Sequence, residues 1–269
     1  MVKKLFKHEV LAYTRILWIV WAILLGVAAL GRFVQLFEYD AVPYHIINGS
    51  SIFMYGVAVI GVLVFPLIFG VMRFYKNLFT GEGYLTFTLP VTPFQHVLFK
   101  VLTAVLMTVG SLIMVLISVA VITAGEVFGE ILKAAEYLIK LVLQDERALH
   151  IVLYAVEFFL MVLAAVFSEF LLFYACIAIG QTFKKNRVLG AVGAYVIYYV
   201  ICQVFGTIIT VVFSLLSFEF MEKIGRFIME HLITVIHCGL CGLTVLSALL
   251  ALVYFLITHG IIRKKLNLE

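Results

Sequence analysis

Charged residues are scarce in this sequence. Only 13% of its 269 residues are Asp, Glu, Lys or Arg, whereas 65% are apolar, and the mean hydropathy is +1.18. A soluble globular domain is closer to a quarter charged and half apolar. Several apolar runs exceed the ~18 residues that mark a candidate membrane-spanning helix. The composition therefore predicts an all-α integral membrane protein with no room for a separate soluble domain.

Two further absences narrow the range of functions. The sequence contains no Gly-x-x-x-x-Gly-Lys-[Ser/Thr] stretch, and no glycine is followed by lysine. The chain therefore lacks the loop with which many ATPases hold phosphates, and we expect no nucleotide-binding site and no enzyme activity in it. All four cysteines fall in apolar stretches, which argues against a disulfide framework. They are Cys176, Cys202, Cys238 and Cys241.

Six apolar stretches are long enough to cross a membrane, and together they form one domain over residues 1–269. An even number of crossings places both termini on the same side. The apolar run after the basic start is too long for a signal peptide and has no clear small-residue cleavage site, so we expect a retained helix. The predicted spans are 16–37, 52–72, 94–124, 150–180, 188–215 and 233–260.

The basic residues are unevenly divided between the two sides of these spans. The side with the termini carries Lys3, Lys4, Lys7, Arg15, Arg73, Lys76, Lys100, Lys184, Lys185, Arg187, Arg263, Lys264 and Lys265. The other side carries Arg32, Lys133, Lys140, Arg147, Lys223 and Arg226. Basic residues are retained in the cytoplasm during insertion. The asymmetry therefore predicts that both termini and the segment 73–93 are cytoplasmic.

Three segments outside the spans have helical patterns of their own. The start, 1–15, fits a basic amphipathic helix on the inner leaflet, or an ordinary basic flank of the first span. The outer segment 125–149 contains an amphipathic pattern over 126–143, which predicts either a helix along the outer interface or an extension of the third span. The outer segment 216–232 fits a short helical hairpin that dips back into the membrane.

The stretch "FTGEGYLTFTLPVTPFQHVLFK" (79–100) interrupts the apolar sequence with turn-forming residues. Gly81 and Gly83 are suited to ending the preceding helix. Thr92, Pro93 and Gln95 fit a capping box with proline at the first helical position, which predicts that the next helix begins here. The apolar residues between these signals predict either a docking surface or packing against this protein's own helices.

The same stretch resembles the most characteristic segment of ABC-2-type transporter permeases. In that family an acid and a glycine precede a short apolar stretch, followed by a proline, a small or hydroxyl residue and a lysine. The positions that match are Glu82, Gly83, Tyr84, Leu85, Phe87, Leu89, Pro90, Thr92 and Lys100. The resemblance implies the architecture of a type V exporter, in which this cytoplasmic segment, including Glu82 to Pro90, couples the permease to its ATPase.

The resemblance also implies the partners and the cargo. A separate ATPase subunit, in two copies, would bind ATP and Mg²⁺, and a second copy of this chain or a close paralogue would complete the pore. The protein would lie in the cytoplasmic membrane of a bacterium, contact the lipid bilayer and bind no nucleic acid. The cargo would be hydrophobic or amphipathic, such as an antimicrobial peptide or toxin; the alternatives are drug or lipid export, or a membrane-embedded enzyme or channel without an ATPase.

Glu157 and Glu169 lie inside the fourth predicted span. A charge at the bilayer centre costs ~2.5–3.5 kcal/mol even on lenient scales, so such acids normally face protein or water. They therefore predict either a polar lining for the cargo or local pairing, of Glu157 with Arg147 or His150 and of Glu169 with a neighbouring hydroxyl or protonated group. In the sixth predicted span, "HCGLC" (237–241) contains possible metal ligands, but no second cluster completes a tetrahedral set, and we expect it to serve helix packing.

Overall fold

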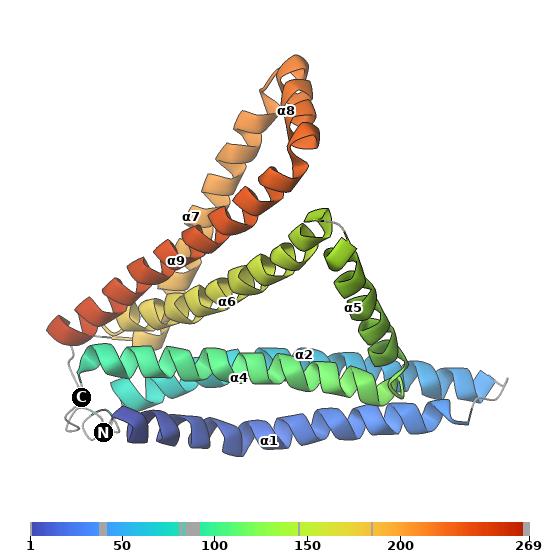
Figure 1. Ribbon diagram of the computed structural model, residues 1–269. Coiled ribbons are helices and arrows are strands. Elements are labelled where there is room, and N and C mark those ends of the chain that lie inside the picture. The colour runs from blue at the N-terminus through green and yellow to red at the C-terminus, as the bar shows by residue number, and fades with distance from the viewer. Residues whose placement is uncertain are drawn as a thin grey trace. The chain divides into compact units, whose positions relative to one another are not determined.

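The computed structural model describes residues 2–37, 42–80, 83, 92–144, 146–183 and 185–265. Within those ranges all regular secondary structure is helical, which confirms the all-α prediction for this part of the chain (Figure 1). The helices are α1 (Val2–Gln35), α2 (Val42–Phe79), α4 (Pro93–Ile122), α5 (Glu126–Gln144), α6 (Glu146–Gly180), α7 (Arg187–Ser214), α8 (Phe218–Glu230) and α9 (Leu232–Lys265).

Six of these helices are long and apolar enough to cross a membrane. Their apolar segments run from 28 residues in α7 to 37 in α2, and about 20 residues suffice to cross the hydrocarbon core. The six predicted spans coincide with α1, α2, α4, α6, α7 and α9, and most of these helices extend beyond the predicted bounds. The chain is therefore a multi-pass membrane protein.

The chain divides into two compact units. The first holds Met1–Phe74 and Pro90–Glu146, and the second holds Tyr75–Leu89 and Arg147–Glu269. Helices α1, α4 and α5 and most of α2 thus belong to the first unit, while α6 to α9 belong to the second.

In the first unit, α1 packs along α4. Buried positions on α1 include Leu17, Leu24 and Ala28, at helical spacing, so one stripe of the helix is apolar and enclosed. Two polar contacts also join the helices of this unit. The indole N–H of Trp21 donates to the hydroxyl of Ser111 on α4 at 3.1 Å, and the hydroxyls of Tyr55 on α2 and Ser118 on α4 are 2.8 Å apart.

The basic start of the chain belongs to α1. The helix is continuous from Val2 to Gln35 and has no break near residue 15. Residues 2–15, for which the sequence left an interfacial helix and a basic flank of the first span as alternatives, are therefore the first part of a longer helix. This first part of α1 packs against α4 and α2. The rings of Phe6 and Phe99 on α4 are 5.9 Å apart, and the ring of Tyr13 meets that of Phe69 on α2 edge to face at 4.7 Å.

A defined break separates α4 from α5. Ala124 and Gly125 both have positive φ, 51° and 81°. The N–H of Gly125 donates to the carbonyl of Ala120 at 2.8 Å, and the N–H of Ala124 donates to that of Val121 at 3.2 Å. These two bonds form a Schellman motif, which ends a helix and turns the chain. Helix α5 is therefore a separate helix, and its description as an extension of the third span is wrong.

The segment between α7 and α9 forms one helix, α8. Ser217 caps its start by accepting the N–H of Phe220 at 3.4 Å, and the helix continues through Gly225 to Glu230. The predicted hairpin over 216–232 is therefore wrong. Helix α7 ends at Ser214 and Ser217 is the N-cap of α8, so the turn between these two helices is short. Helix α9 begins directly after His231.

Helices α6 and α7 form a tight hairpin. A side chain at Gly180 would meet the backbone N of Ala191 and the backbone O of Arg187, each at 2.6 Å. A Cβ at Gly190 would lie 3.3 Å from the Cα of Gly180. Glycine at these two positions lets the two backbones approach closely, as small residues do in membrane bundles.

Candidate functional site

Acids on apolar helices are the starting point for a functional site in this chain, because a carboxylate in an apolar helix requires a partner. The structure contains two clusters built around such an acid. One surrounds Glu9 in the first unit, and the other surrounds Glu157 in the second.

The first cluster joins three helices through one carboxylate. The Nε of Arg73 donates to Oε2 of Glu9 at 2.6 Å, and the Nζ of Lys100 donates to Oε1 at 2.9 Å. The side chains of Glu9 and Lys100 are only 8% and 5% exposed, and that of Arg73 is 17% exposed. Each carboxylate oxygen therefore binds one cation, and α1, α2 and α4 are held at one point.

In the sequence, the two cations of this cluster flank the insert that links α2 to α4. Arg73 precedes the end of α2 at Phe79 by less than two turns, and Lys100 follows the start of α4 by two turns. The capping box predicted at that start is confirmed. The side chain of Thr92 accepts the N–H of Gln95 at 3.4 Å, and the side chain of Gln95 accepts the N–H of Thr92 at 3.2 Å.

Most of the predicted coupling residues lie outside the described part of the chain. These are Glu82, Tyr84, Leu85, Phe87, Leu89 and Pro90. Gly83 is described, and its N–H donates to the carbonyl of Thr80 at 2.7 Å. Helix α2 ends at Phe79, two residues before Gly81, where the sequence predicted an end.

Sequence reasoning missed Glu9. It counted Arg73 as a basic residue that fixes the orientation, and Lys100 as such a residue and as part of the segment that resembles ABC-2-type permeases. A signal was nevertheless present, because Glu9 is the one acid in the sequences of α1, α2 and α4. A single acid among three helices that carry several cations is a candidate for burial against them.

The second cluster is a chain of three side chains on α6 and α9. Nδ1 of His237 lies 2.7 and 2.8 Å from the two carboxylate oxygens of Glu157. Its other ring nitrogen, Nε2, lies 3.0 Å from Nδ1 of His150. His150 and Glu157 are seven residues apart, which places both on one face of α6, opposite α9.

Tyr154 completes this cluster. It lies between His150 and Glu157 on the same face of α6, and its ring centroid is 4.5 Å from that of His237. Its hydroxyl donates to the backbone carbonyl of Ile233 at 3.2 Å. The aromatic ring and the hydroxyl therefore both fix α6 against α9 beside the imidazole.

The structure refines the sequence predictions for Glu157. Local pairing with His150 or Arg147 was one of two alternatives; the observed partner is His237, which in turn contacts His150, while the side chain of Arg147 lies outside the described part. His237 was predicted to serve helix packing only. In the described ranges, no three His, Cys, Asp or Glu side chains are arranged to hold a metal ion.

Glu169 differs from Glu157, although both lie on α6. Its side chain is half-buried, and no hydrogen bond or ion pair to it is found among the described residues. It is near enough to Cys176 and Tyr254 for its charge to act on both groups. The structure does not bring the two acids together.

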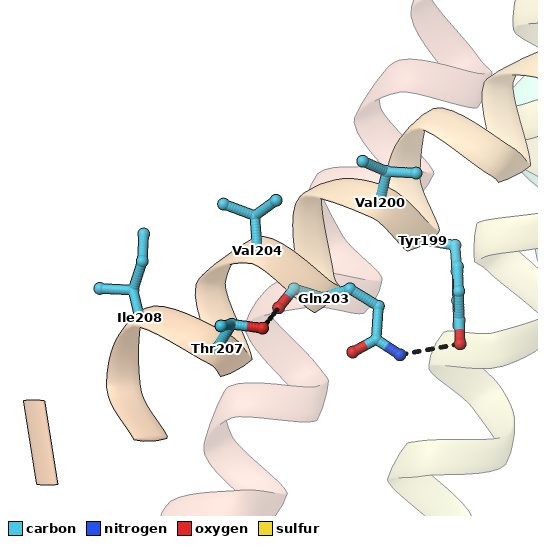
Figure 2. A pocket seen from close by; sticks show the side chains of 6 residues that line it. All are labelled: Tyr199, Val200, Gln203, Val204, Thr207 and Ile208. Carbon is cyan, nitrogen blue, oxygen red and sulfur yellow. Dashed lines mark hydrogen bonds between the residues drawn. The ribbon is translucent and has the colours of Figure 1, made fainter. Parts of the chain in front are cut away.

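Helix α7 carries a polar stripe on a helix with no buried residue in its described length. Figure 2 shows Tyr199, Gln203 and Thr207 along one side, with the amide nitrogen of Gln203 donating to the hydroxyl of Tyr199 at 2.8 Å. The hydroxyl of Thr207 donates to the backbone carbonyl of Gln203. With Val200, Val204 and Ile208 they line a shallow groove of about 300 Å³.

Comparisons of this chain with protein families, with characterised proteins and with solved structures give no match. The resemblance of the 79–100 stretch to ABC-2-type permeases therefore remains a hypothesis from the sequence.

Proposed function

We propose that this protein is the transmembrane permease subunit of an ABC exporter. It would move a hydrophobic or amphipathic cargo, such as an antimicrobial peptide or toxin, out of the cell. A separate ATPase subunit, in two copies, would bind ATP and Mg²⁺ and drive transport. A second copy of this chain or a close paralogue would supply the other half of the pathway.

The observation that carries this proposal is the ion-pair cluster of Glu9, Arg73 and Lys100. A coupling segment must pass its movement to the helices that enclose the pathway. Arg73 and Lys100 flank the insert on either side, and both bind Glu9 on α1. A displacement of the insert by a bound ATPase would therefore shift α1, α2 and α4 together instead of bending one helix end.

The polar groups on the second unit supply candidates for the cargo pathway. Glu157, Glu169 and the Gln203 stripe on α7 place polar atoms on otherwise apolar helices, where such groups usually face protein or a polar pathway. They suit a cargo with both apolar and cationic parts. Export of a drug or a lipid by the same architecture is the main alternative for the cargo.

The proposal predicts that an ABC ATPase is encoded beside this chain, and it is tested with that ATPase. Co-expressed with it, the full-length permease should retain the ATPase through purification. The double change Tyr84→Ala/Phe87→Ala should weaken this retention by roughly thirtyfold or more, because truncating a buried aromatic anchor of an interface costs about 2 kcal/mol or more. Glu82→Gln should have a smaller effect, since an exposed ion pair contributes only ~0.2–1 kcal/mol.

Phe218→Ala is the matched control, because Phe218 is an aromatic residue 84% exposed on α8, far from the insert in the sequence. It should leave ATPase binding unchanged. The proposal is wrong if no ATPase binds the parental chain, or if the double variant inserts normally, keeps its ATPase and transports at the parental rate.

A further inference from the structure

The proposed function uses Glu157 but gives no role to the two histidines joined to it. Glu157, His237 and His150 form a continuous hydrogen-bonded chain, with distances of 2.7 to 3.0 Å between successive groups. All three side chains change their charge by gaining or losing a proton. Chains of acids and histidines inside membrane helices are a known means of binding and moving protons.

The geometry limits the positions of the protons. When Glu157 is ionised its carboxylate only accepts hydrogen bonds, so Nδ1 of His237, which faces it, then carries a proton. Nε2 of His237 then has two options toward Nδ1 of His150. It accepts a hydrogen bond when His237 is neutral, and it donates one when His237 is an imidazolium. Both states keep every hydrogen bond of the chain, so a proton is gained or lost without breaking a contact.

The two states differ in net charge. With both imidazoles neutral, the cluster carries the single negative charge of Glu157. With one added proton it becomes a neutral pair of carboxylate and imidazolium, which an apolar environment favours over an isolated charge. The ring of Tyr154, 4.5 Å from His237, also favours the cationic form, because aromatic rings attract cations.

We propose that Glu157, His237 and His150 form a proton-binding site between α6 and α9, which takes up and releases one proton as a His237 imidazolium. A proton from water binds Nε2 of His150, which forms no hydrogen bond in the described part of the chain. The proton on Nδ1 of His150 then moves along the existing bond to Nε2 of His237. His150 is left neutral with its proton on Nε2, and release follows the reverse path.

The groups that face this site come from two helices. Helix α6 contributes His150, Tyr154 and Glu157, and α9 contributes His237. No further hydrogen bond or ion pair joins these four side chains to another titratable group within the described ranges. The proposed site does not depend on an ATPase, and it is tested on the purified chain alone.

The test is a pH titration of the full-length protein in lipid nanodiscs, with ¹⁵N-labelled histidine rings followed by NMR. Ring ¹⁵N chemical shifts distinguish the two neutral tautomers from each other and from the imidazolium. They therefore show directly which ring nitrogens carry a proton, which heavy-atom positions leave to inference. The parental protein should show one histidine that is in the Nδ1–H tautomer when neutral and becomes an imidazolium as the pH is lowered from 8 to 5. His237→Gln should remove that signal.

Five further variants separate a proton site from a structural contact. Glu157→Gln should weaken proton binding at His237, whereas Glu169→Gln on the same helix should leave it unchanged. Tyr154→Leu should weaken it by roughly two- to fivefold through loss of the cation–π contact, while Tyr154→Phe, which keeps the ring, should preserve it. His150→Gln still bonds to both forms of His237, so it should preserve proton binding and slow proton exchange.

The proposal is overturned if His237 keeps one protonation state from pH 5 to 8 in the parental protein. It is also overturned if Glu157→Gln and Glu169→Gln shift the titration of His237 equally. The first of these results is read on the parental protein and needs only His237→Gln, which assigns the signal, so a failure of the Glu157, Tyr154 or His150 variants to fold leaves the test intact.

Discussion

The two acid clusters bind similar carboxylates with different partners. Glu9 is held by Arg73 and Lys100, two side chains of classes that are cationic at neutral pH. Glu157 is held by His237, whose class of side chain gains and loses its charge in that range. The Glu9 cluster therefore joins opposite charges, whereas the Glu157 cluster, in the proposal above, changes its charge with the number of bound protons.

This difference corresponds to two kinds of task. A fixed, buried ion pair is suited to holding helices in one arrangement, because breaking it carries a large penalty. A histidine chain is suited to changing state, since both of its protonation states keep their hydrogen bonds. The Glu9 cluster of the first unit is thus suited to holding α1, α2 and α4 together, and the proposed role of the Glu157 cluster in the second unit is to bind a proton.

The largest effect is expected from removing the shared carboxylate of the first cluster. Glu9→Gln should destabilise the protein by about 3–5 kcal/mol, because both buried cations lose the charge that compensates them. Chemical unfolding of the purified protein in mixed micelles measures this. Glu130→Gln, at an exposed acid on α5, is the control and should change stability little. If Glu9→Gln and Glu130→Gln lower the stability of the protein equally, the Glu9 cluster does not hold the three helices together.

A smaller effect is expected at Glu157, and it should differ from that at Glu169. Glu157→Leu removes a hydrogen bond to a charged group, which is worth about 1.5–3 kcal/mol. Glu169→Leu should be neutral or stabilising, because it removes a half-buried charge for which the described part of the chain offers no hydrogen bond or ion pair. The same unfolding measurement compares them, and a larger loss at Glu169 would contradict the structure.

The smallest effect is expected for an exposed ion pair. On α5, Nζ of Lys140 lies 2.7 Å from Glu136, and both side chains are about two-thirds exposed. Glu136→Gln should cost no more than about 0.3–0.5 kcal/mol, and the loss should disappear at high salt. The cost of Glu9→Gln should persist in the same salt, because the buried cluster is screened much less. If the stability cost of Glu9→Gln also disappears at high salt, the Glu9 cluster is screened in the same way as the exposed ion pair on α5, and the expected difference between them is absent.

The success of the sequence predictions depended on how local their signals were. The positions of the six long helices follow from apolar runs, and the Thr92 box follows from three residues within one turn. The separate α5 helix was one of two alternatives, and only the positive φ of Ala124 and Gly125 decided it. The hairpin over 216–232 was wrong, because a strong amphipathic pattern and the Ser217 cap outweigh one central glycine.

The sequence by itself determined that this chain is helical, that six helices are apolar enough to cross a membrane, and where the insert ends and α4 begins. Only the tertiary structure decided which charged residues meet. Glu9 pairs with residues 64 and 91 positions away, and Glu157 with one 80 positions away. Such pairs depend on how each helix is rotated and placed against its neighbours, and the periodicity of a single helix carries no information about this.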